Sequence, residues 1–468
     1  MEVQKHILIL YLVLCRKMSL KQRAMLRIVL IRMLKSSILI FGSILVFNSC
    51  SSDEVLSLDE QHESKILGAY DEECRWVYAQ MNHDYLWRKD MPDSLACDYT
   101  TDPVTFFKSL LSSKDKFSYS THNSSYVGTS DFVKYGFEYQ EYTDGNTNFA
   151  QVLYVTSPKL KERGLKRGDL VQLHDNKIIL GVLCSNGFES RDTIEGSSPF
   201  EQTTTVYLDS IYQIERKKVG YMCYLQFNNK KDLTNVLKHF YEEQIDELVL
   251  DLRYNPGGLV STCKYLSNSV ISENGYGEIF QQCTYNDILS REYFEATGSE
   301  KTFNHFRIPN NGKGLPGSEL YGLNLKRIFV LTSKYSASAS EALIISLKPF
   351  MSVVVIGEQT YGKGVGSWTI RNNKYKYQLQ PITMQYYNAK METVTTDGIP
   401  VDYYVPDGYS TTKRNLGDVE EPLLKTALDL IKMEKLVMGG NACSRSVAFE
   451  EQNEGFKAIG KPSFGRDY

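Results

Sequence analysis

The sequence predicts a multidomain protein of the α/β (α+β) class. From Val219 onward an apolar strand to Leu225, an amphipathic helix over Asp232 to Gln244 and a second apolar strand, Leu248 to Asp251, follow one another. The same alternation recurs further along the chain, and strand–helix–strand order indicates one sheet with crossover helices. Before this region a helical segment and then a run of short strands and turns occur. We therefore expect a helical N-terminal cap, a β-rich domain and an α/β domain, in that order.

The expected boundaries follow these changes of pattern. They are a targeting region over residues 1–49, an N-terminal segment with a helical cap over 50–125, a β-rich domain over 126–215, an α/β domain over 216–437 and a loose polar tail over 438–468. In the cap, Tyr70 to Met81 carries aromatic residues three and four positions apart, so this helix should bury one face. Ser112 to Lys116 and Ser118 to Ser125 are polar, which predicts a linker.

Several elements are predicted less strongly. The polar turn Asp144 to Asn148 fits a hairpin between the first two strands of the β-rich domain, and the chain from Ser185 onward is expected to be irregular. Tyr375 to Met384 and Met391 to Val394 are expected to be antiparallel strands. Asp418 to Met438 predicts a final amphipathic helix.

The first fifty residues have the features of a targeting signal. Lys17 to Lys35 is basic, Ile38 to Phe47 is apolar, and a serine precedes Cys50. We expect the true start at Met33 and a bacterial lipoprotein signal with Cys50 as the lipidated residue. An ordinary signal peptide or a membrane anchor is the alternative, because Asn48 is not the small apolar residue that such a signal favours.

Composition argues against some classes of protein. The formal net charge of −3 over 468 residues argues against a nucleic-acid binder. The nine cysteines form no Cys-x-x-Cys pair and no grouping with histidine, so no metal site is expected. No motif calls for a cofactor.

The segment from Leu331 to Gly366 carries the strongest chemical signal. A predicted strand ends at Leu331 and a predicted helix begins at Glu341, so three serines lie at a strand-to-helix turn: Ser336, Ser338 and Ser340. The first amides of a helix have no partner within it and can stabilise an oxyanion, which suits such a turn to a nucleophilic serine. A serine that merely caps the helix is the alternative.

A nucleophilic serine needs a base, and no histidine lies in this segment. Lys363 stands between two glycines, shortly after the apolar strand Val353 to Ile356. At the end of a buried strand its amine would be partly desolvated, and desolvation lowers the pKa of a lysine toward the range in which it accepts protons. Lys363 is therefore the candidate base.

Three motifs occur in order: LVLDLRYNPGGLV from Leu248, SASASE from Ser336 and GEQTYGKG from Gly357. Together they resemble the C-terminal processing (tail-specific) serine peptidases. In that family a serine of the small-residue run lies about 25 residues before the lysine of the Gly-Lys-Gly loop. The resemblance implies that Ser338 is the nucleophile and Lys363 the base, on a sheet of the ClpP/crotonase-like kind.

The resemblance also implies where the oxyanion would be held. Amides in the Gly257 and Gly258 region, together with the amide of Ala339, would form the oxyanion hole. The third member of the site departs from the family pattern, because the glutamine expected four residues after the lysine is Ser367 and the alternative aspartate position is Pro349. Ser367 is a possible partner of Lys363 through its hydroxyl.

The β-rich domain resembles a PDZ domain, in its order of strand, Ser-Pro, short helix, Gly-Asp and strand. Such domains bind a C-terminal peptide as an added strand and hold its carboxylate with backbone amides. On this resemblance Gly136 and Phe137 are candidate carboxylate-loop residues. A β-rich spacer without ligand binding is the alternative.

The motifs together predict an exported serine endopeptidase, lipid-anchored to the bacterial outer membrane, that acts on protein or peptide substrates through their C-terminal tails. It would need no cofactor or metal and would bind no nucleic acid. A weak or inactive family member that binds peptides or apolar ligands is one alternative, favoured by the missing glutamine. An esterase or amidase with the same two residues is another.

Overall fold

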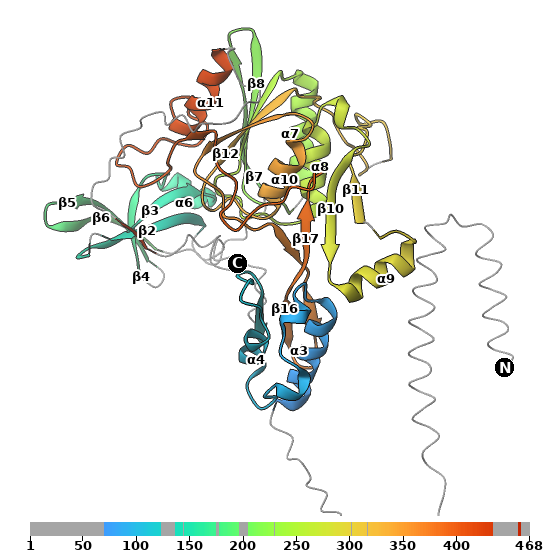
Figure 1. Cartoon of the computed structure of the whole chain (residues 1–468). Helices are drawn as coiled ribbons and strands as arrows, with labels where there is room; N and C mark the ends of the chain where they lie inside the picture. Colours follow the sequence, from blue (N-terminus) through green and yellow to red (C-terminus); the bar gives the residue numbers. More distant parts are fainter. Residues whose placement is uncertain are drawn as a thin grey trace, which may run out of the picture. The chain divides into compact units, whose positions relative to one another are not determined.

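The computed structural model of the chain describes residues 70–122, 136–143, 145–174, 177–195, 205–228, 230–300, 302–315, 317–433 and 457–459 (Figure 1). Gly68–Tyr293 and Ser299–Tyr468 form one unit, and Phe294–Gly298 is assigned to another. The predicted targeting region and Cys50 lie outside the described residues. None of the helices that the structure describes has both the length and the hydrophobicity needed to cross a membrane.

The N-terminal helical region contains α3 (Asp71–Asp84), η1 (Arg88–Asp90), η2 (Ser94–Ala96), α4 (Pro103–Ser109) and strand β1 (Tyr119–His122). Helix α3 confirms the first predicted helix, since Cys74, Val77 and Met81 lie on its buried face. Helix α4 begins at a proline because the side chain of Asp102 accepts hydrogen bonds from the next free backbone amides.

The segment predicted to be a linker is structured. Asp115 accepts hydrogen bonds from the amides of Phe117 and Ser118, and β1 pairs antiparallel with β16 (Tyr377–Gln380). The linker prediction is therefore wrong for Ser112–Lys116 and for β1. Polar residues here bond to the backbone and so stabilise a turn, which composition alone does not distinguish from flexibility.

The β-rich sheet has the strand order β19-β2-β3-β4-β5-β6. Its elements are β2 (Phe137–Thr143), β3 (Asn148–Val155), α6 (Pro158–Glu162), β4 (Leu170–His174), β5 (Lys177–Cys184), β6 (Gly187–Glu195) and β19 (Lys457–Ile459). The predicted hairpin between the first two strands is confirmed, since β2 and β3 pair antiparallel. The expectation of irregular chain after Ser185 is wrong, because Cys184 pairs with Gly187 in a β5–β6 hairpin. The Asn-Gly pair at this turn is a hairpin signal.

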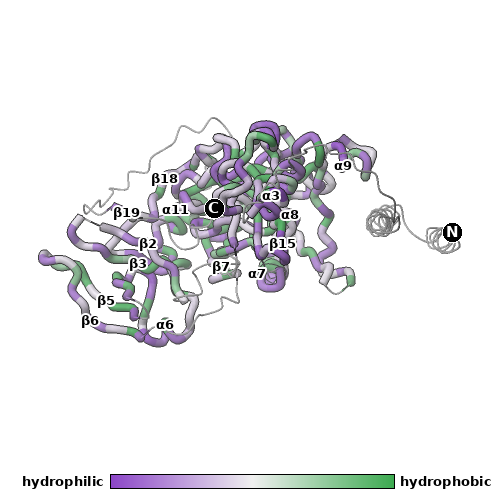
Figure 2. Tube along the Cα trace, turned by 90° about the horizontal axis from the view of Figure 1, so that it is seen from below, coloured by the Kyte–Doolittle hydropathy of each residue, from purple (hydrophilic) through white to green (hydrophobic). Residues whose placement is uncertain are grey.

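Strand β19 lies at the edge of this sheet, beside β2 (Figure 2). It pairs antiparallel, with Lys457 opposite Thr143 and Ile459 opposite Glu141. The tail was predicted to be loose, and for these three residues that prediction is wrong. The edge of β2 thus accepts an extended segment of the chain itself.

A second six-stranded sheet has the order β18-β13-β12-β9-β8-β7. Its strands are β7 (Val206–Ile214), β8 (Lys217–Tyr224), β9 (Glu247–Asp251), β12 (Arg327–Thr332), β13 (Ser352–Gly357) and β18 (Tyr403–Tyr404). Neighbours from β8 to β18 are parallel, whereas β7 is antiparallel to β8. The strands predicted here are confirmed, but the boundary expected after residue 215 falls inside the β7–β8 hairpin.

Alternate residues of this sheet enter two apolar layers. Leu248 and Leu250 of β9 pack in a cluster with residues of α7 (Lys230–Glu243), α8 (Val260–Val270) and α10 (Ala339–Leu347). Val249, between them, packs in a second cluster with Leu424 of α11 (Pro422–Lys432). Helices α7, α8 and α10 therefore cover one face and α11 the other (Figure 1).

The register of the parallel strands brings the three sequence motifs together. Asp251, at the end of β9, pairs with Leu331 of β12, and Leu331 pairs with Ile356 of β13. The chain therefore leaves all three strands at the same edge of the sheet. In open α/β sheets this carboxyl edge is where active sites form.

Two smaller sheets have the orders β11-β10-β17-β14 and β1-β16-β15. The remaining elements are η3 (Glu273–Gly275), β10 (Ile279–Tyr285), α9 (Asp287–Thr297), β11 (Thr302–His305), β14 (Val365–Ser367), β15 (Ile370–Asn372) and β17 (Ile382–Tyr387). The strand predicted from Tyr375 is confirmed as β16 and β17. The strand predicted over Met391 to Val394 is wrong, because the side chain of Asn388 accepts the amides of Lys390 and Glu392 and forms a turn.

The predicted final helix is confirmed but starts later than expected. Glu421, 2% exposed, accepts a hydrogen bond from the amide of Leu424, and Pro422 occupies the first turn of α11. A capping side chain followed by proline sets the start of a helix. The helix therefore begins at Pro422 and not at Asp418.

A buried network of charges connects the β-rich sheet with the α/β sheet. Arg167, in the turn before β4, contacts Asp407 at 2.6 Å. Arg253, just after β9, contacts Asp251 at 2.9 Å and Glu421 at 2.6 Å, and lies 3.8 Å from Asp407. Burial alone would raise the pKa of Asp407, but the adjacent cations hold it far below its ordinary value.

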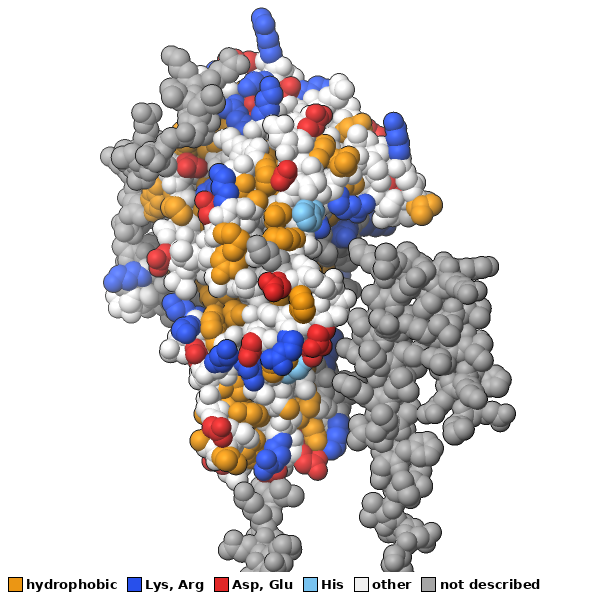
Figure 3. All heavy atoms as spheres, turned by 45° about the vertical axis from the view of Figure 1, so that its right-hand side comes forward, with side chains coloured by type: hydrophobic (Ala, Val, Ile, Leu, Met, Phe, Trp, Pro, Cys, Tyr) orange, Lys and Arg blue, Asp and Glu red, His pale blue; other side chains and the backbone are white. Residues whose placement is uncertain are grey.

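The surface carries charges of both signs. On the face drawn in Figure 3, basic and acidic side chains are interspersed over the described residues. Exposed ion pairs include Lys374–Glu72 at 2.7 Å and Lys114–Asp90 at 3.0 Å. Such exposed pairs contribute about 0–1 kcal/mol each.

Candidate active site

Ser338 lies at the junction between β12 and α10, where it precedes the first residue of the helix. Its φ of 55° and ψ of −109° are a conformation that residues other than glycine rarely adopt. Such backbone strain costs about 1–3 kcal/mol and is found at functional turns. Ser338 is half-buried.

The two neighbouring serines have structural roles. Both are fully buried, and their hydroxyls donate to backbone carbonyls, from Ser336 to Leu252 at 2.8 Å and from Ser340 to Asn255 at 2.9 Å. These bonds attach the serine turn to the Asn-Pro-Gly-Gly turn after β9. Of the three candidate serines, Ser338 is the one that is not buried.

Glu341 connects the serine turn with the Gly-Lys-Gly loop. Its carboxylate accepts hydrogen bonds from the amides of Ser338 at 2.8 Å, Gly362 at 2.7 Å and Lys363 at 2.8 Å, and from the hydroxyl of Thr360 at 2.6 Å. Burial raises the pKa of this carboxyl, and the four donors oppose that shift. One side chain therefore holds the backbones of Ser338 and Lys363 together.

Tyr386, on β17, makes a second connection. Its hydroxyl lies 2.6 Å from the carbonyl oxygen of Lys363 and 3.1 Å from that of Ser338. The tyrosine is buried, and burial raises its pKa, so the phenol stays protonated and donates. The separation of the serine turn and the lysine loop is thus fixed from two sides.

Lys363 is 5% exposed. Its Nζ atom lies 5.6 Å from the centre of the Phe117 ring, which belongs to the N-terminal helical region. Burial lowers the pKa of Lys363 to about 8, while the carboxylates of Asp115 and Glu341 counteract this shift. A sizeable neutral fraction near pH 8 makes this amine suitable as a general base.

The Asn-Pro-Gly-Gly turn packs directly on the serine turn. A Cβ atom at Gly257, whose φ is +108°, would lie 2.8 Å from the Cβ of Ser338 and 2.9 Å from the amide nitrogen of Ala339. Only glycine permits this approach. The Gly257 amide, however, donates to the side chain of Asn255 at 2.9 Å, so it is not available to an oxyanion.

Gly258 and Ala339 offer the remaining predicted amides. Gly258 is exposed and lies between two backbone hydrogen bonds. The amide of Phe227 donates to the Gly257 carbonyl, and the amide of Leu259 donates to the Phe227 carbonyl. Ala339 is the first residue of α10, and the first amides of a helix lack a partner within the helix. These two amides are therefore the better-placed pair of the three predicted donors.

Ser367 lies on β14, and its hydroxyl accepts a hydrogen bond from the side-chain amide of Gln380 at 2.9 Å. The charged groups that act on Lys363 are instead Asp115 and Glu341. Ser367, which occupies the position expected for a glutamine, is therefore hydrogen-bonded to a residue of β16.

The predicted carboxylate-loop residues lie at the start of the β-rich sheet. The carbonyl of Gly136 accepts hydrogen bonds from the amides of Thr156 and Ser157, and the Phe137 side chain lies in the core of that sheet. The preceding residues, 123–135, are outside the described part of the chain. The edge of β2, which begins at Phe137, carries β19.

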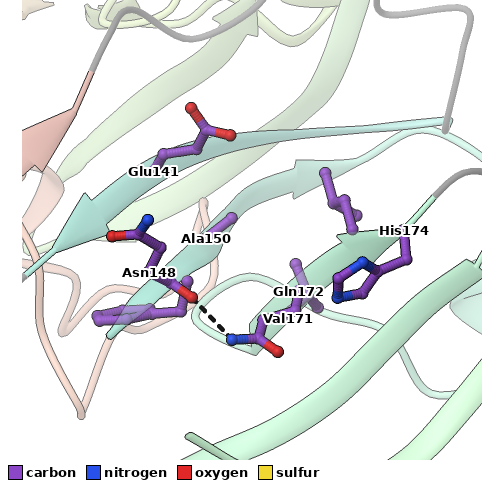
Figure 4. Close-up of a pocket in the computed structure, with 8 residues that line it drawn as sticks. Glu141, Asn148, Ala150, Val171, Gln172 and His174 are labelled. Carbon is purple, nitrogen blue, oxygen red and sulfur yellow. Dashed lines mark hydrogen bonds between the residues drawn. The ribbon is translucent and has the colours of Figure 1, made fainter. Parts of the chain in front are cut away.

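A shallow pocket of about 440 Å³ lies on the same sheet (Figure 4). Polar side chains line it from three strands: Glu141 from β2, Asn148 from β3, and Gln172 and His174 from β4. The Gln172 side chain donates to the Asn148 carbonyl at 2.8 Å. The pocket is separate from the serine turn and contains none of the candidate catalytic residues.

Sequence reasoning missed Asp115, Glu341 and Tyr386. Glu341 stands three residues after Ser338, the spacing of a capping box, and this signal could have identified it. Asp115 and Tyr386 carry no such local signal. Among the described residues no group of three or more histidine, cysteine, aspartate or glutamate side chains is placed to hold a metal ion.

A serine at a strand-to-helix turn, fixed beside a buried lysine of lowered pKa, defines a site of the serine-hydrolase kind. Comparison with known proteins places the fold in a family. The model of peptidase family S41 matches residues 218–405, and that of the peptidase S41 N-terminal domain matches residues 72–119. The chain belongs to peptidase family S41, a family of serine-type peptidases.

Individual relatives are distant. The chain is 23% identical over 332 residues to a "Probable CtpA-like serine protease" of Staphylococcus haemolyticus. The aligned region covers 66% of this chain and 58% of that relative. It is 29% identical over 164 residues to the carboxy-terminal processing protease CtpB of Bacillus subtilis, over 34% of this chain and 28% of that relative. These matches span little more than half of the relatives, or less.

A solved structure shares the fold. The chain resembles the "Putative S41 protease" of Bacteroides fragilis with a TM-score of 0.65 and 22% sequence identity, over 83% of this chain and 100% of that one. This likeness supports the multidomain α/β arrangement with an N-terminal helical region and β-rich sheets.

Proposed function

We propose that the chain is a serine endopeptidase in which Ser338 is the nucleophile and Lys363 the general base. One observation carries this proposal. Hydrogen bonds from the side chains of Glu341 and Tyr386 hold the serine turn and the loop of the buried lysine together. The lowered pKa of Lys363 supports a proton-accepting role. A binding protein would have no need of a lysine in this state.

The reaction would follow the chemistry of an acyl-enzyme. The neutral amine of Lys363 takes the proton of the Ser338 hydroxyl while its oxygen attacks the scissile carbonyl. The amides of Gly258 and Ala339 stabilise the oxyanion of the tetrahedral intermediate. The lysine ammonium then protonates the leaving amine, and water hydrolyses the ester in a second round.

The β-rich region would recruit substrates by their C-terminal tails, as a PDZ domain does. Supporting this, β2 begins at Phe137, directly after Gly136, and pairs along its edge with an added strand, β19. Backbone pairing of this kind accepts many sequences, because the hydrogen bonds come from the main chain. Protein or peptide tails are therefore the proposed ligands.

The sequence supports a location in the bacterial cell envelope. The signal-like segment that ends at Cys50 motivates a lipid anchor in the outer membrane. Replacing Cys50 and following lipid labelling and membrane association would test this part of the proposal.

An active-site serine probe tests the proposed activity. A fluorophosphonate should label the purified protein at Ser338, because only an activated serine reacts at an appreciable rate, and peptide mapping would identify the modified residue. Ser338→Ala should not be labelled. An unlabelled wild-type protein that also fails to digest an unfolded protein would instead indicate a peptide-binding protein.

Recruitment can be tested separately from cleavage. A peptide with a free C-terminal carboxylate should bind the Ser338→Ala protein more tightly than its amidated form, by about 1–3 kcal/mol, the value of a charge-assisted hydrogen bond. Fluorescence anisotropy measures both affinities. A variant with residues 457–459 replaced by a Gly-Ser stretch should bind more tightly still, because β19 occupies the β2 edge. Equal binding of both peptides would reduce the region to a spacer.

A further inference from the structure

The turn that follows α4 lies against Lys363. The amine lies 5.6 Å from the centre of the Phe117 ring, and this ring meets the Tyr361 ring edge-on at 6.1 Å. Phe117 belongs to an apolar cluster that the helical region shares with Val365 and Ile382. The helical region thus helps to bury Lys363. The sequence predicts this burial only from the strand Val353 to Ile356, which precedes the lysine.

Asp115 is the acidic residue of this turn, and its carboxylate is fixed from both sides. One oxygen accepts the amides of Phe117 at 2.8 Å and Ser118 at 2.9 Å, and the other accepts the hydroxyl of Tyr85 at 2.8 Å. Tyr85 is fully buried, and its hydroxyl accepts the amide of Ser112 at 3.0 Å. Three donors therefore hold the carboxylate beside the residue whose ring contacts the lysine.

The charges that act on Lys363 come from two elements. Burial lowers the pKa of Lys363 to about 8, and Asp115, followed by Glu341 of α10, opposes this shift. Glu341 already accepts hydrogen bonds from three backbone amides and a hydroxyl. Next to the turn, Lys114 and Asp90 pair with each other at 3.0 Å. Asp115 is the nearby carboxylate that does not belong to the α/β domain.

We propose that Asp115, fixed in the turn that packs on Lys363, is the carboxylate that stabilises the ammonium form of this lysine, and so takes the role of third member for which Ser367 was the candidate. The inference rests on the proposed pair of Ser338 and Lys363. When the amine takes the serine proton, an ammonium forms in a buried place. A fixed carboxylate in this turn stabilises that ammonium through its negative charge, as the aspartate does for the imidazolium in a Ser-His-Asp triad.

The pH dependence of peptide hydrolysis tests this role. In the full chain, Asp115→Asn should move the midpoint of the rise in kcat to lower pH, by roughly one unit, because a negative charge near the ammonium is lost. It should also lower the plateau of kcat roughly tenfold or more, with little change in KM. Tyr85→Phe, which removes one of the three donors, should shift both in the same direction by less.

Asp102→Asn is the matched control. Asp102 also belongs to the helical region and also accepts two backbone amides, from Val104 and Thr105. Asp102→Asn should leave the pH midpoint of kcat unchanged. If Asp115→Asn lowers Tm but keeps the wild-type midpoint and kcat, Asp115 is merely structural and the inference is wrong. Activity in Lys363→Arg would refute the proposed base instead, so the two failures are distinguishable.

Discussion

Replacing Ser338 with alanine should abolish hydrolysis of an unfolded protein substrate. Removing the nucleophile of an acyl-enzyme mechanism lowers kcat by about 10³-fold or more. The free energy of unfolding should fall by only about 0.5–2 kcal/mol, the cost of losing an N-cap side chain, because Ser338 takes part in a capping box at the start of α10 and alanine meets the same backbone strain as serine. Initial rates of digestion and thermal unfolding measure the two quantities.

The neighbouring serines provide matched controls. Ser336→Ala and Ser340→Ala remove buried hydroxyls that donate to the carbonyls of Leu252 and Asn255. Each should lower the free energy of unfolding by about 1–3 kcal/mol, since a buried acceptor loses its donor. The folded fraction should keep most of its activity. A loss of activity in one of these variants, with Ser338→Ala still active, would overturn the assignment.

Lys363→Arg should be as inactive as Lys363→Ala. The guanidinium keeps the positive charge, but it does not deprotonate in the working pH range and so cannot accept the serine proton. In the wild type, kcat should rise with pH through one ionisation near the pKa of about 8, since the neutral amine is the reactive form. A pH–rate profile from pH 6 to pH 10 measures this midpoint.

Lys348→Arg is the control for this substitution, because Lys348 lies exposed at the end of α10. It should retain wild-type activity and the same pH profile. Substantial hydrolysis by Lys363→Arg would mean that Lys363 acts through its charge or its packing. The base would then have to be another group within reach of Ser338.

The α/β region could be predicted from sequence because its strands are continuous apolar runs. Ser338 and Lys363 follow two such strands, and parallel strands end at the same edge, so local patterns were enough to place them near each other. The turn around Gly257 was similarly evident from its glycines. The use of the Gly257 amide by Asn255 was not, since it depends on a single side-chain rotamer.

Contacts between distant segments could not be predicted. Asp115 lies in a stretch whose polar composition indicates a linker, and only the packing of the helical region on the lysine loop gives it a role. Tyr386 similarly looks like any strand tyrosine. Strand β7 directly follows the β-rich domain in the sequence, so its residue pattern assigned it to that domain. It pairs instead with β8 of the α/β sheet, and the partner of a strand cannot be read from the residues of that strand alone.

The buried ion pairs around Asp407 mean that the β-rich region is not a detachable module. A chain shortened to the α/β domain would lose Arg167, the closest cation to this carboxylate at 2.6 Å, and leave Lys413 at 3.1 Å and Arg253 at 3.8 Å. Removing one partner of a buried pair costs about 3–5 kcal/mol, a large share of a typical domain stability of about 5–15 kcal/mol. Exchanging the recognition region for that of another peptidase would therefore preserve folding only if an arginine of matching reach came with it.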